Sequence, residues 1–249
     1  MTPAEQPATT GRTEAERVAA RERMSAAVAS LGEGQPQFHY VDEEAVAWSI
    51  GPQTLAWMLE YLPNTRSTLE TGCGYSTVLF AAAGTEHIVV TPEAAEVERM
   101  RAFCAERRIS TDGVREVIGD STRALASLEL PELDLVLIDG AHAFPVPCID
   151  WYFTQPSLRA GGHVVVDDFR MPSVAPLVSF LRAERPTWRE VAVAGNSIIF
   201  EKLAHDDYSR DWELQFVNRH AMRPPIPRRT RLKLRRTWRD LCALLHRGR

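Results

Sequence analysis

The sequence lacks long apolar runs and has few cysteines. No apolar stretch approaches 18 residues, and the N-terminus lacks the basic and then apolar pattern of a secretion signal. The cysteines are far apart in the sequence and form no Cys-x-x-Cys pair: Cys73, Cys104, Cys148 and Cys242. This spacing argues against a zinc site and against a disulfide framework. We therefore expect a cytoplasmic protein without a transmembrane segment.

Positive charge is scarce outside the C-terminal end of the chain. Residues 219–249 hold 11 of the 29 Lys and Arg residues and one acid, so this tail is basic and the remainder is acidic. After a stiff proline-rich linker, Arg228 to Arg247 read as a basic helix with an apolar stripe of Leu234, Trp238, Leu241 and Leu245. We expect this stripe to pack on the body or on a second subunit. An anionic membrane surface or a nucleic acid is the alternative, and the scarcity of aromatic residues disfavours nucleic acid.

The chain is long enough for one α/β domain with short extensions. It has 249 residues, of which 45% are hydrophobic and 25% charged, as is ordinary for a globular protein. We expect a disordered tail over 1–12, a helical cap over 13–62, a core over 63–204 and an extension with the basic helix over 205–249.

Strands and helices alternate along the expected core. Apolar strands are predicted over 67–71, 87–91, 114–118, 133–139 and 163–167, and a hairpin over 188–194 and 197–202. Helices are predicted between them, over 77–83, 93–107, 121–128, 147–158 and 173–184. Gly161-Gly162 is expected to end the helix over 147–158, because glycine is common beyond a helix C-terminus. The pattern predicts a Rossmann-like, doubly wound, mostly parallel seven-stranded sheet with an antiparallel closing hairpin, preceded by N-terminal helices.

A glycine turn follows the first core strand. Glu70-Thr71-Gly72-Cys73-Gly74-Tyr75-Ser76 lacks the third glycine of the dinucleotide-binding fingerprint. Its glycines would let the backbone approach a ligand, and the acid suits a ligand that carries an ammonium group. A purely structural connection between strand and helix is the alternative.

Acids and a histidine follow two further strands. Asp139 and His142 come after one buried strand, and Asp167-Asp168 after the next. Because parallel strands end at one edge, these carboxylates should converge there, where ligands bind. Converging carboxylates suit a hard divalent cation. The alternative is that one acid caps a helix and another faces solvent.

Together these motifs resemble the class I S-adenosylmethionine-dependent methyltransferases. They are most similar to the metal-dependent small-molecule O-methyltransferases of the macrocin and mycinamicin type. The resemblance covers about 67–202, and its most specific stretch is 138–169, with Asp139-Gly140-x-His142, Asp150, Gly161-Gly162 and Asp167-Asp168. It implies that S-adenosylmethionine is held by Glu70, Gly72, Gly74, Tyr75, Ser76, Glu93, Asp120, Ser121 and Asp139. It also implies Mg²⁺ ligands at Asp139, Asp167 and Asp168.

The resemblance implies that His142 is the general base. A metal would lower the pKa of the acceptor hydroxyl, and the histidine would take its proton as oxygen attacks the methyl group. A helix cap, or a partner for a neighbouring carboxylate, is the alternative role of His142. Asp150 matches the family pattern and can equally be structural. His39, Trp48, Trp151 and Tyr152 are candidates to line the acceptor pocket, although packing is the commoner fate of such residues.

One feature departs from the family pattern. The second core strand ends Val90-Thr91-Pro92, where the family has an acid that binds the ribose, so Glu93 or Thr91 must take that role.

The predicted function is transfer of a methyl group to a hydroxyl of a sugar or other small natural product. The alternatives are a methyltransferase-like protein that binds without catalysis, and a nucleic-acid methyltransferase. The chain lacks the Asn/Asp-Pro-Pro-Tyr string of enzymes that methylate amino groups in DNA.

Overall fold

The computed structural model describes residues 11–34, 36–46, 49–205, 215, 216 and 218. The chain divides into two units, residues 1–207 and 208–249, and the fold described below belongs to the first. Trp48 and the predicted basic helix over 228–247 lie outside the described residues. Within the described part of the chain, no helix is long and apolar enough to cross a membrane.

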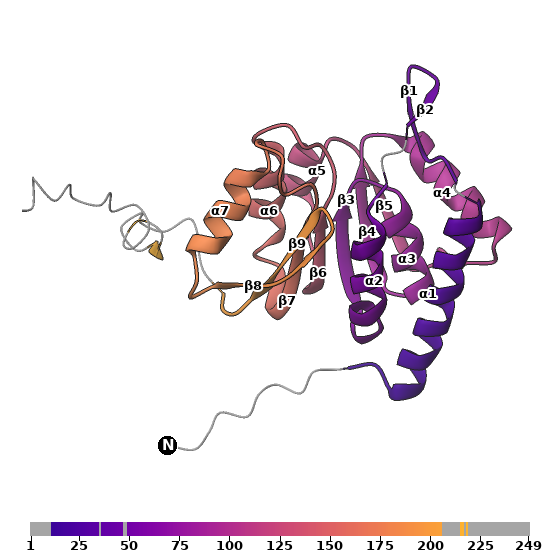
Figure 1. Ribbon diagram of the computed structural model, residues 1–249, viewed down its shortest axis with the longest axis horizontal. Helices are drawn as coiled ribbons and strands as arrows, with labels where there is room; N and C mark the ends of the chain where they lie inside the picture. The colour runs from indigo at the N-terminus through magenta and orange to yellow at the C-terminus, as the bar shows by residue number, and fades with distance from the viewer. Residues whose placement is uncertain (1–10, 35, 47–48, 206–214, 217, 219–249) are drawn as a thin grey trace, which may run out of the picture. The chain divides into compact units, whose positions relative to one another are not determined.

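A seven-stranded sheet forms the centre of the first unit, in the order β5-β4-β3-β6-β7-β9-β8 (Figure 1). The five strands from β5 to β7 are parallel, β9 is antiparallel to β7, and β8 is antiparallel to β9. The strands are β3 Ser67–Thr71, β4 Glu86–Thr91, β5 Val114–Ile118, β6 Leu133–Ile138, β7 Leu158–Val166, β8 Trp188–Ala194 and β9 Ser197–Lys202. The predicted mostly parallel sheet with its antiparallel hairpin is therefore confirmed.

Helices cover both faces of this sheet, as Figure 1 shows. One face carries α1 Glu14–Gly34, α2 Pro52–Tyr61, the short 3₁₀ helix η1 Leu62–Asn64, α3 Tyr75–Ala83 and α4 Ala94–Glu106. The other face carries α5 Ser121–Ser127, α6 Val146–Thr154 and α7 Ala175–Ala183. The doubly wound arrangement predicted from the alternation is thus confirmed.

Helix α3 is buried along almost its whole length, and its position explains this burial. Every residue from Ser76 to Ala83 is buried, because α3 packs against the sheet and is itself covered by α1. Helix α1 turns one stripe inwards, formed by Ala20, Met24, Ala27 and Leu31. The spacing of four, three and four residues keeps these side chains on one helical face. The N-terminal helices therefore complete the core rather than form a separate layer.

The boundary between α6 and β7 differs from the prediction. Helix α6 ends at Thr154, and β7 already begins at Leu158, so Gly161-Gly162 lies within the strand and does not end the helix. Gly161 has φ of 78°, and a Cβ on Gly162 would lie 2.8 Å from a methyl carbon of Leu158. The pair produces a register shift opposite Leu133 and Leu135.

Two further elements were not predicted. Strands β1 His39–Val41 and β2 Glu44–Val46 form a hairpin around Asp42 and Glu43, which both have positive φ. The turn lacks the Asn-Gly or Asp-Gly pair that usually predicts this geometry.

Arg12, which the sequence analysis assigned to a disordered tail, is buried and donates to Ala83 O and Gly84 O at 2.6 and 2.5 Å.

Candidate active site

The carboxyl ends of the five parallel strands meet at one edge of the sheet, and the residues singled out from the sequence follow these ends. The neighbouring strands β3 and β6 are parallel, and the order in which the chain adds strands to the sheet reverses between them; open α/β sheets bind ligands at such a switch point. The segments that this topology brings to the edge are 72–76 after β3, 92–96 after β4, 119–121 after β5, 139–142 after β6 and 167–168 after β7.

The glycine turn after β3 packs closely against the segment that follows β6. Gly72 has φ of 92°, and a Cβ there would lie 2.5 Å from the carbonyl oxygen of Asp139. A Cβ on Gly140 would in turn lie 3.2 Å from Thr71 Cβ. The segments after β3 and β6 thus cross in contact, and this crossing requires glycine independently of any ligand.

Gly74 leaves room for a histidine from the hairpin. A Cβ on Gly74 would lie 3.2 Å from His39 Nε2, so β1 lies over the glycine turn. Tyr75, the first residue of α3, packs edge-on against Phe38 and donates from its hydroxyl to Pro36 O at 3.2 Å. The hairpin and the chain before it therefore cover the place where a ligand of the glycine turn would lie.

Glu70 is enclosed under the first turn of α3. It is 1% exposed, and its carboxylate accepts hydrogen bonds from the hydroxyls of Ser76 and Thr77. His87 Nε2 on β4 lies 3.0 Å from the same carboxylate, and its ring stacks on Phe80. Glu70 thus has hydrogen-bond partners within the protein itself. The hydroxyl of Ser76 belongs to the same hydrogen-bond network.

A histidine and two carboxylates meet beyond β6 and β7. His142 Nε2 lies 3.8 Å from Asp139 Oδ1 and 3.7 Å from Asp168 Oδ2. No hydrogen-bond partner of His142 Nε2 is found among the described residues. Burial, followed by repulsion from Asp167, Glu70 and Asp168, raises the pKa of Asp139 well above its ordinary value. The three side chains therefore form a compact group that can accept or release a proton.

Asp167 lies within hydrogen-bonding reach of Asp139 and is also held from the interior of the protein by β9. It is 8% exposed and accepts a hydrogen bond from Ser197 on β9. Ser197 Oγ lies 2.6 Å from Thr54 Oγ1, which donates to Ala194 O at 3.0 Å. Ser197 on β9 thereby connects Asp167, at the end of β7, to Thr54 on α2. Asp168, with φ of 47°, turns back towards His142 and accepts from Asn196 at 3.4 Å.

The predicted magnesium ligands do not fit a metal ion in this arrangement. Among the described residues, no group of three or more His, Cys, Asp or Glu side chains is placed to hold one. One oxygen of Asp167 accepts a hydrogen bond from Ser197, and His142 Nε2 lies within 4 Å of both Asp139 and Asp168.

At the end of β4, the structure brings in an acid that the sequence pattern did not single out. Glu93 is exposed at the N-terminus of α4, and its backbone N–H donates to Thr91 Oγ1 at 3.3 Å. Glu96, one turn further on, reaches back: its carboxylate accepts from Thr91 Oγ1 at 3.2 Å and lies 2.7 Å from His39 Nδ1. Its position three residues after the helix cap was the signal available in the sequence.

After β5, Asp120 caps α5. Its carboxylate accepts from the backbone N–H of Thr122 at 2.9 Å and from the Thr122 hydroxyl, and these bonds lower its pKa. Ser121 is the first residue of α5 and faces Asp150 on α6. Asp120 and Ser121 therefore lie at the predicted edge. One oxygen of the Asp120 carboxylate already accepts hydrogen bonds from the first turn of α5.

Asp150 is a fully buried carboxylate behind this edge. It is 0% exposed, and neither oxygen has a hydrogen-bond partner of normal geometry among the described residues; the same holds for the hydroxyl of Thr71 beside it. Burial raises the pKa of Asp150 to about 6, against the weaker effects of Ser121 and Thr71. This burial places Asp150 in the interior rather than at the surface of the site.

Of the candidates to line an acceptor pocket, two lie away from the site. Trp151 is 6% exposed and packs against Phe180 and Trp188 in the core. Tyr152 is exposed on α6 and contacts Phe153 edge-on. Of the described candidates, His39 is placed against the glycine turn.

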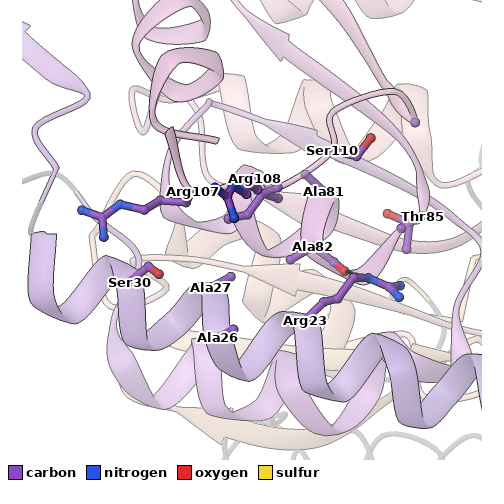
Figure 2. Close-up of a pocket in the computed structure, with 13 residues that line it drawn as sticks. Arg23, Ala26, Ala27, Ser30, Ala81, Ala82, Thr85, Arg107, Arg108 and Ser110 are labelled. Carbon is purple, nitrogen blue, oxygen red and sulfur yellow. Dashed lines mark hydrogen bonds between the residues drawn. The ribbon is translucent and has the colours of Figure 1, made fainter. Parts of the chain in front are cut away.

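A cavity of about 340 Å³ lies elsewhere, between α1, the end of α3 and the end of α4 (Figure 2). Alanines of α1 and α3 form its apolar wall, and Arg23, Arg107 and Arg108 lie around it. Thr85 and Gly113 in its lining precede β4 and β5, so the cavity opens at the amino ends of the strands. It shares no lining residue with the carboxyl edge and is not the site described above.

The comparisons with known proteins agree with this geometry. Residues 69–169 match a family model described as a methyltransferase domain. No curated protein matches the chain. Similar solved structures include the cofactor-bound protein Rv0187 from MTB, with 18% identity over 74% of this chain and 91% of the other at a TM-score of 0.55.

Two more of these structures are O-methyltransferases. TomG from Streptomyces achromogenes, in complex with SAM, has 20% identity over 74% of this chain and 90% of the other, with a TM-score of 0.50. The enzyme from Bacillus cereus, in complex with SAH, has 15% identity over 74% and 91%, with a TM-score of 0.53. These findings confirm the general resemblance to the class I S-adenosylmethionine-dependent methyltransferases and do not single out the macrocin and mycinamicin type. The chain thus has the class I methyltransferase fold, and its residues 69–169 match the model of a methyltransferase domain.

Proposed function

We propose that the protein transfers a methyl group from S-adenosylmethionine to a hydroxyl of a small molecule, with His142 as the general base. The observation that carries this proposal is the position of His142 Nε2 within 4 Å of both Asp139 and Asp168, at the edge where this fold binds ligands. The solved O-methyltransferases with SAM or SAH support the choice of cofactor and of an oxygen acceptor.

The chemistry required of the protein is modest. The sulfonium methyl group is already activated, so the chain must hold the acceptor oxygen in line with it and remove the acceptor proton. His142 would take that proton, and the carboxylates of Asp139 and Asp168 would stabilise the imidazolium that forms. The C–O bond forms as the C–S bond breaks, and S-adenosylhomocysteine leaves.

No step of this proposal passes through a magnesium ion. Asp167 accepts a hydrogen bond from Ser197, His142 lies within 4 Å of the other two carboxylates, and no group of three ligands is placed to hold a metal ion among the described residues. A sugar or other natural product remains the class of acceptor we propose. The fold does not identify this acceptor, because specificity depends on the loops around the site.

Isothermal titration of S-adenosylmethionine and S-adenosylhomocysteine into the full chain, with and without Mg²⁺, tests the cofactor. A micromolar dissociation constant for either nucleoside, which corresponds to a binding free energy of about −8 kcal/mol, would support the proposal. A screen of hydroxylated small molecules for a gain of one methyl group in mass then identifies the acceptor. Binding without turnover on any acceptor would favour a recognition protein, and absence of binding to both nucleosides would contradict the proposal.

A further inference from the structure

Glu96 is a carboxylate held at the end of β4 by two other elements. Thr91 at the strand end donates to Glu96 Oε2 at 3.2 Å, and His39 Nδ1 of the hairpin lies 2.7 Å from Glu96 Oε1. The side chain of Glu96 is 13% exposed and that of His39 is 14% exposed. A first-turn glutamate that merely stabilised its own helix would not need partners from a strand and a hairpin.

The same carboxylate lies beside the glycine turn. A Cβ on Gly74 would lie 3.2 Å from His39 Nε2, so the histidine that contacts Glu96 also touches this turn. The negative charge of Glu96 contributes, after burial and Glu70, to raising the pKa of the Cys73 thiol within the turn. Glu96 is therefore next to the ligand edge and next to the switch point between β3 and β6.

The other groups near the end of β4 are less suited to receive a ligand. The side chain of Glu93 is exposed, and the hydroxyl of Thr91 already donates to Glu96 and accepts from the backbone of Glu93. Each carboxylate oxygen of Glu96 has one partner in these contacts, and a carboxylate offers about four acceptor positions. Glu96 thus retains the capacity to accept two more hydrogen bonds, the number that a vicinal diol can donate.

We infer that Glu96, positioned by His39 and Thr91, binds the ribose hydroxyls of the nucleoside cofactor, in place of the acid that this chain lacks at the end of β4. The inference rests on the proposed function, because it names the group that would hold that same cofactor. It also gives the hairpin a role: through His39, β1 keeps the Glu96 carboxylate oriented towards the site.

The test combines one substitution with one altered ligand. Wild type, Glu96→Gln and the control Glu98→Gln, at an exposed site on the same helix, are titrated with S-adenosylhomocysteine and with its 2′,3′-dideoxy analogue, which lacks both ribose hydroxyls. Hydrogen bonds to a carboxylate predict that Glu96→Gln weakens S-adenosylhomocysteine binding about 10- to 100-fold, whereas Glu98→Gln changes it less than about 3-fold. The dideoxy analogue should bind wild type and Glu96→Gln with nearly equal affinity, since the lost interaction is then absent from both.

The altered ligand separates a binding role from a structural one. If Glu96 only supported the fold, the substitution would weaken both ligands equally, and the inference would be overturned. Equal affinity of wild type for the two ligands would also overturn it, without reliance on any variant. If wild type binds neither ligand, the proposed function fails as well; if wild type binds S-adenosylhomocysteine and Glu96→Gln binds it equally, the inference alone fails. Thermal unfolding of each variant establishes that it is folded.

Discussion

Gly72 and Asp139 cross at the carboxyl edge so closely that a Cβ on the glycine would lie 2.5 Å from the Asp139 carbonyl oxygen. Together with a φ of 92° at Gly72, this contact makes the glycine a requirement of the fold. The crossing also places the glycine turn directly beside the segment that carries His142. The same backbone contact thus joins the predicted cofactor and catalytic parts of the site.

Gly72→Ala should therefore destabilise the protein by about 2–4 kcal/mol, because the left-handed conformation and the steric overlap both oppose a side chain. Chemical denaturation measures the free energy of unfolding. Gly32→Ala is the matched control: it lies within α1 with nothing within 4 Å of its Cβ position, and should stabilise by about 0.5–1 kcal/mol. Equal stability of Gly72→Ala and wild type would contradict the close crossing.

Glu70→Gln tests whether this acid supports the fold. The substitution removes a buried charge that accepts hydrogen bonds from Ser76, Thr77 and His87, so the free energy of unfolding should fall by about 2–3 kcal/mol. Glu86→Gln, an exposed site on β4, should change it by less than about 0.5 kcal/mol. Unchanged stability combined with loss of S-adenosylhomocysteine binding would show instead that Glu70 contacts the ligand, as the family resemblance implies.

Asp150→Asn should stabilise the protein at neutral pH but not in acid. Burial raises the pKa of Asp150 to about 6, so the folded state holds this proton more tightly than the unfolded chain does. The contribution of this proton to the free energy of unfolding is fully present below the unfolded pKa of about 4. It falls by about 2–3 kcal/mol as the pH rises through 6. Asparagine cannot ionise, so the Asp150→Asn variant does not lose this free energy of unfolding as the pH rises.

Unfolding of wild type and Asp150→Asn between pH 4 and pH 8, without ligand, measures this difference. The gain from the substitution should grow as pH rises from about 4 to about 7 and then level off. Asp112→Asn, an exposed carboxylate, should show no such dependence. A gain that is constant with pH would mean that the carboxyl of Asp150 does not titrate in this range.

His142→Asn tests the general base. With an acceptor identified by the screen, kcat should fall by about 10²- to 10⁴-fold, while the Kd for S-adenosylhomocysteine stays within about 2-fold. His205→Asn, an exposed histidine at the end of the described core, is the control and should leave both unchanged. A parallel loss of binding and of turnover would assign His142 to cofactor binding instead.

Periodicity was sufficient to predict the sheet. Strands β3, β5, β8 and β9 have the predicted bounds, because turn signals delimit each of them in the sequence. The β1–β2 hairpin was missed since its turn uses Asp42 and Glu43 at positive φ rather than glycine or asparagine. Gly161-Gly162 was misplaced because glycine ends helices and distorts strands alike, and the sequence does not distinguish the two uses.

The site was only partly accessible from the sequence. Topology alone puts Asp139, His142 and Asp168 at one edge, since all three follow parallel strands. The partners of Glu70 and of Asp167 depend on side-chain directions and on α2, and no local pattern encodes these. Glu96 was overlooked because it lies one turn into α4, and only the contacts with Thr91 and His39 bring it back to the strand end.

The most direct test of the central claim, that the carboxyl edge binds S-adenosylmethionine, is backbone amide chemical-shift mapping with S-adenosylhomocysteine. The amides expected to shift are those of the segments 72–76, 93–96, 119–121 and 139–142 at the ends of β3 to β6. Amides around the arginine-lined cavity, at Arg23, Ser30, Arg108 and Ser110, should remain in place. Shifts confined to that cavity, or none at saturating ligand, would contradict the account.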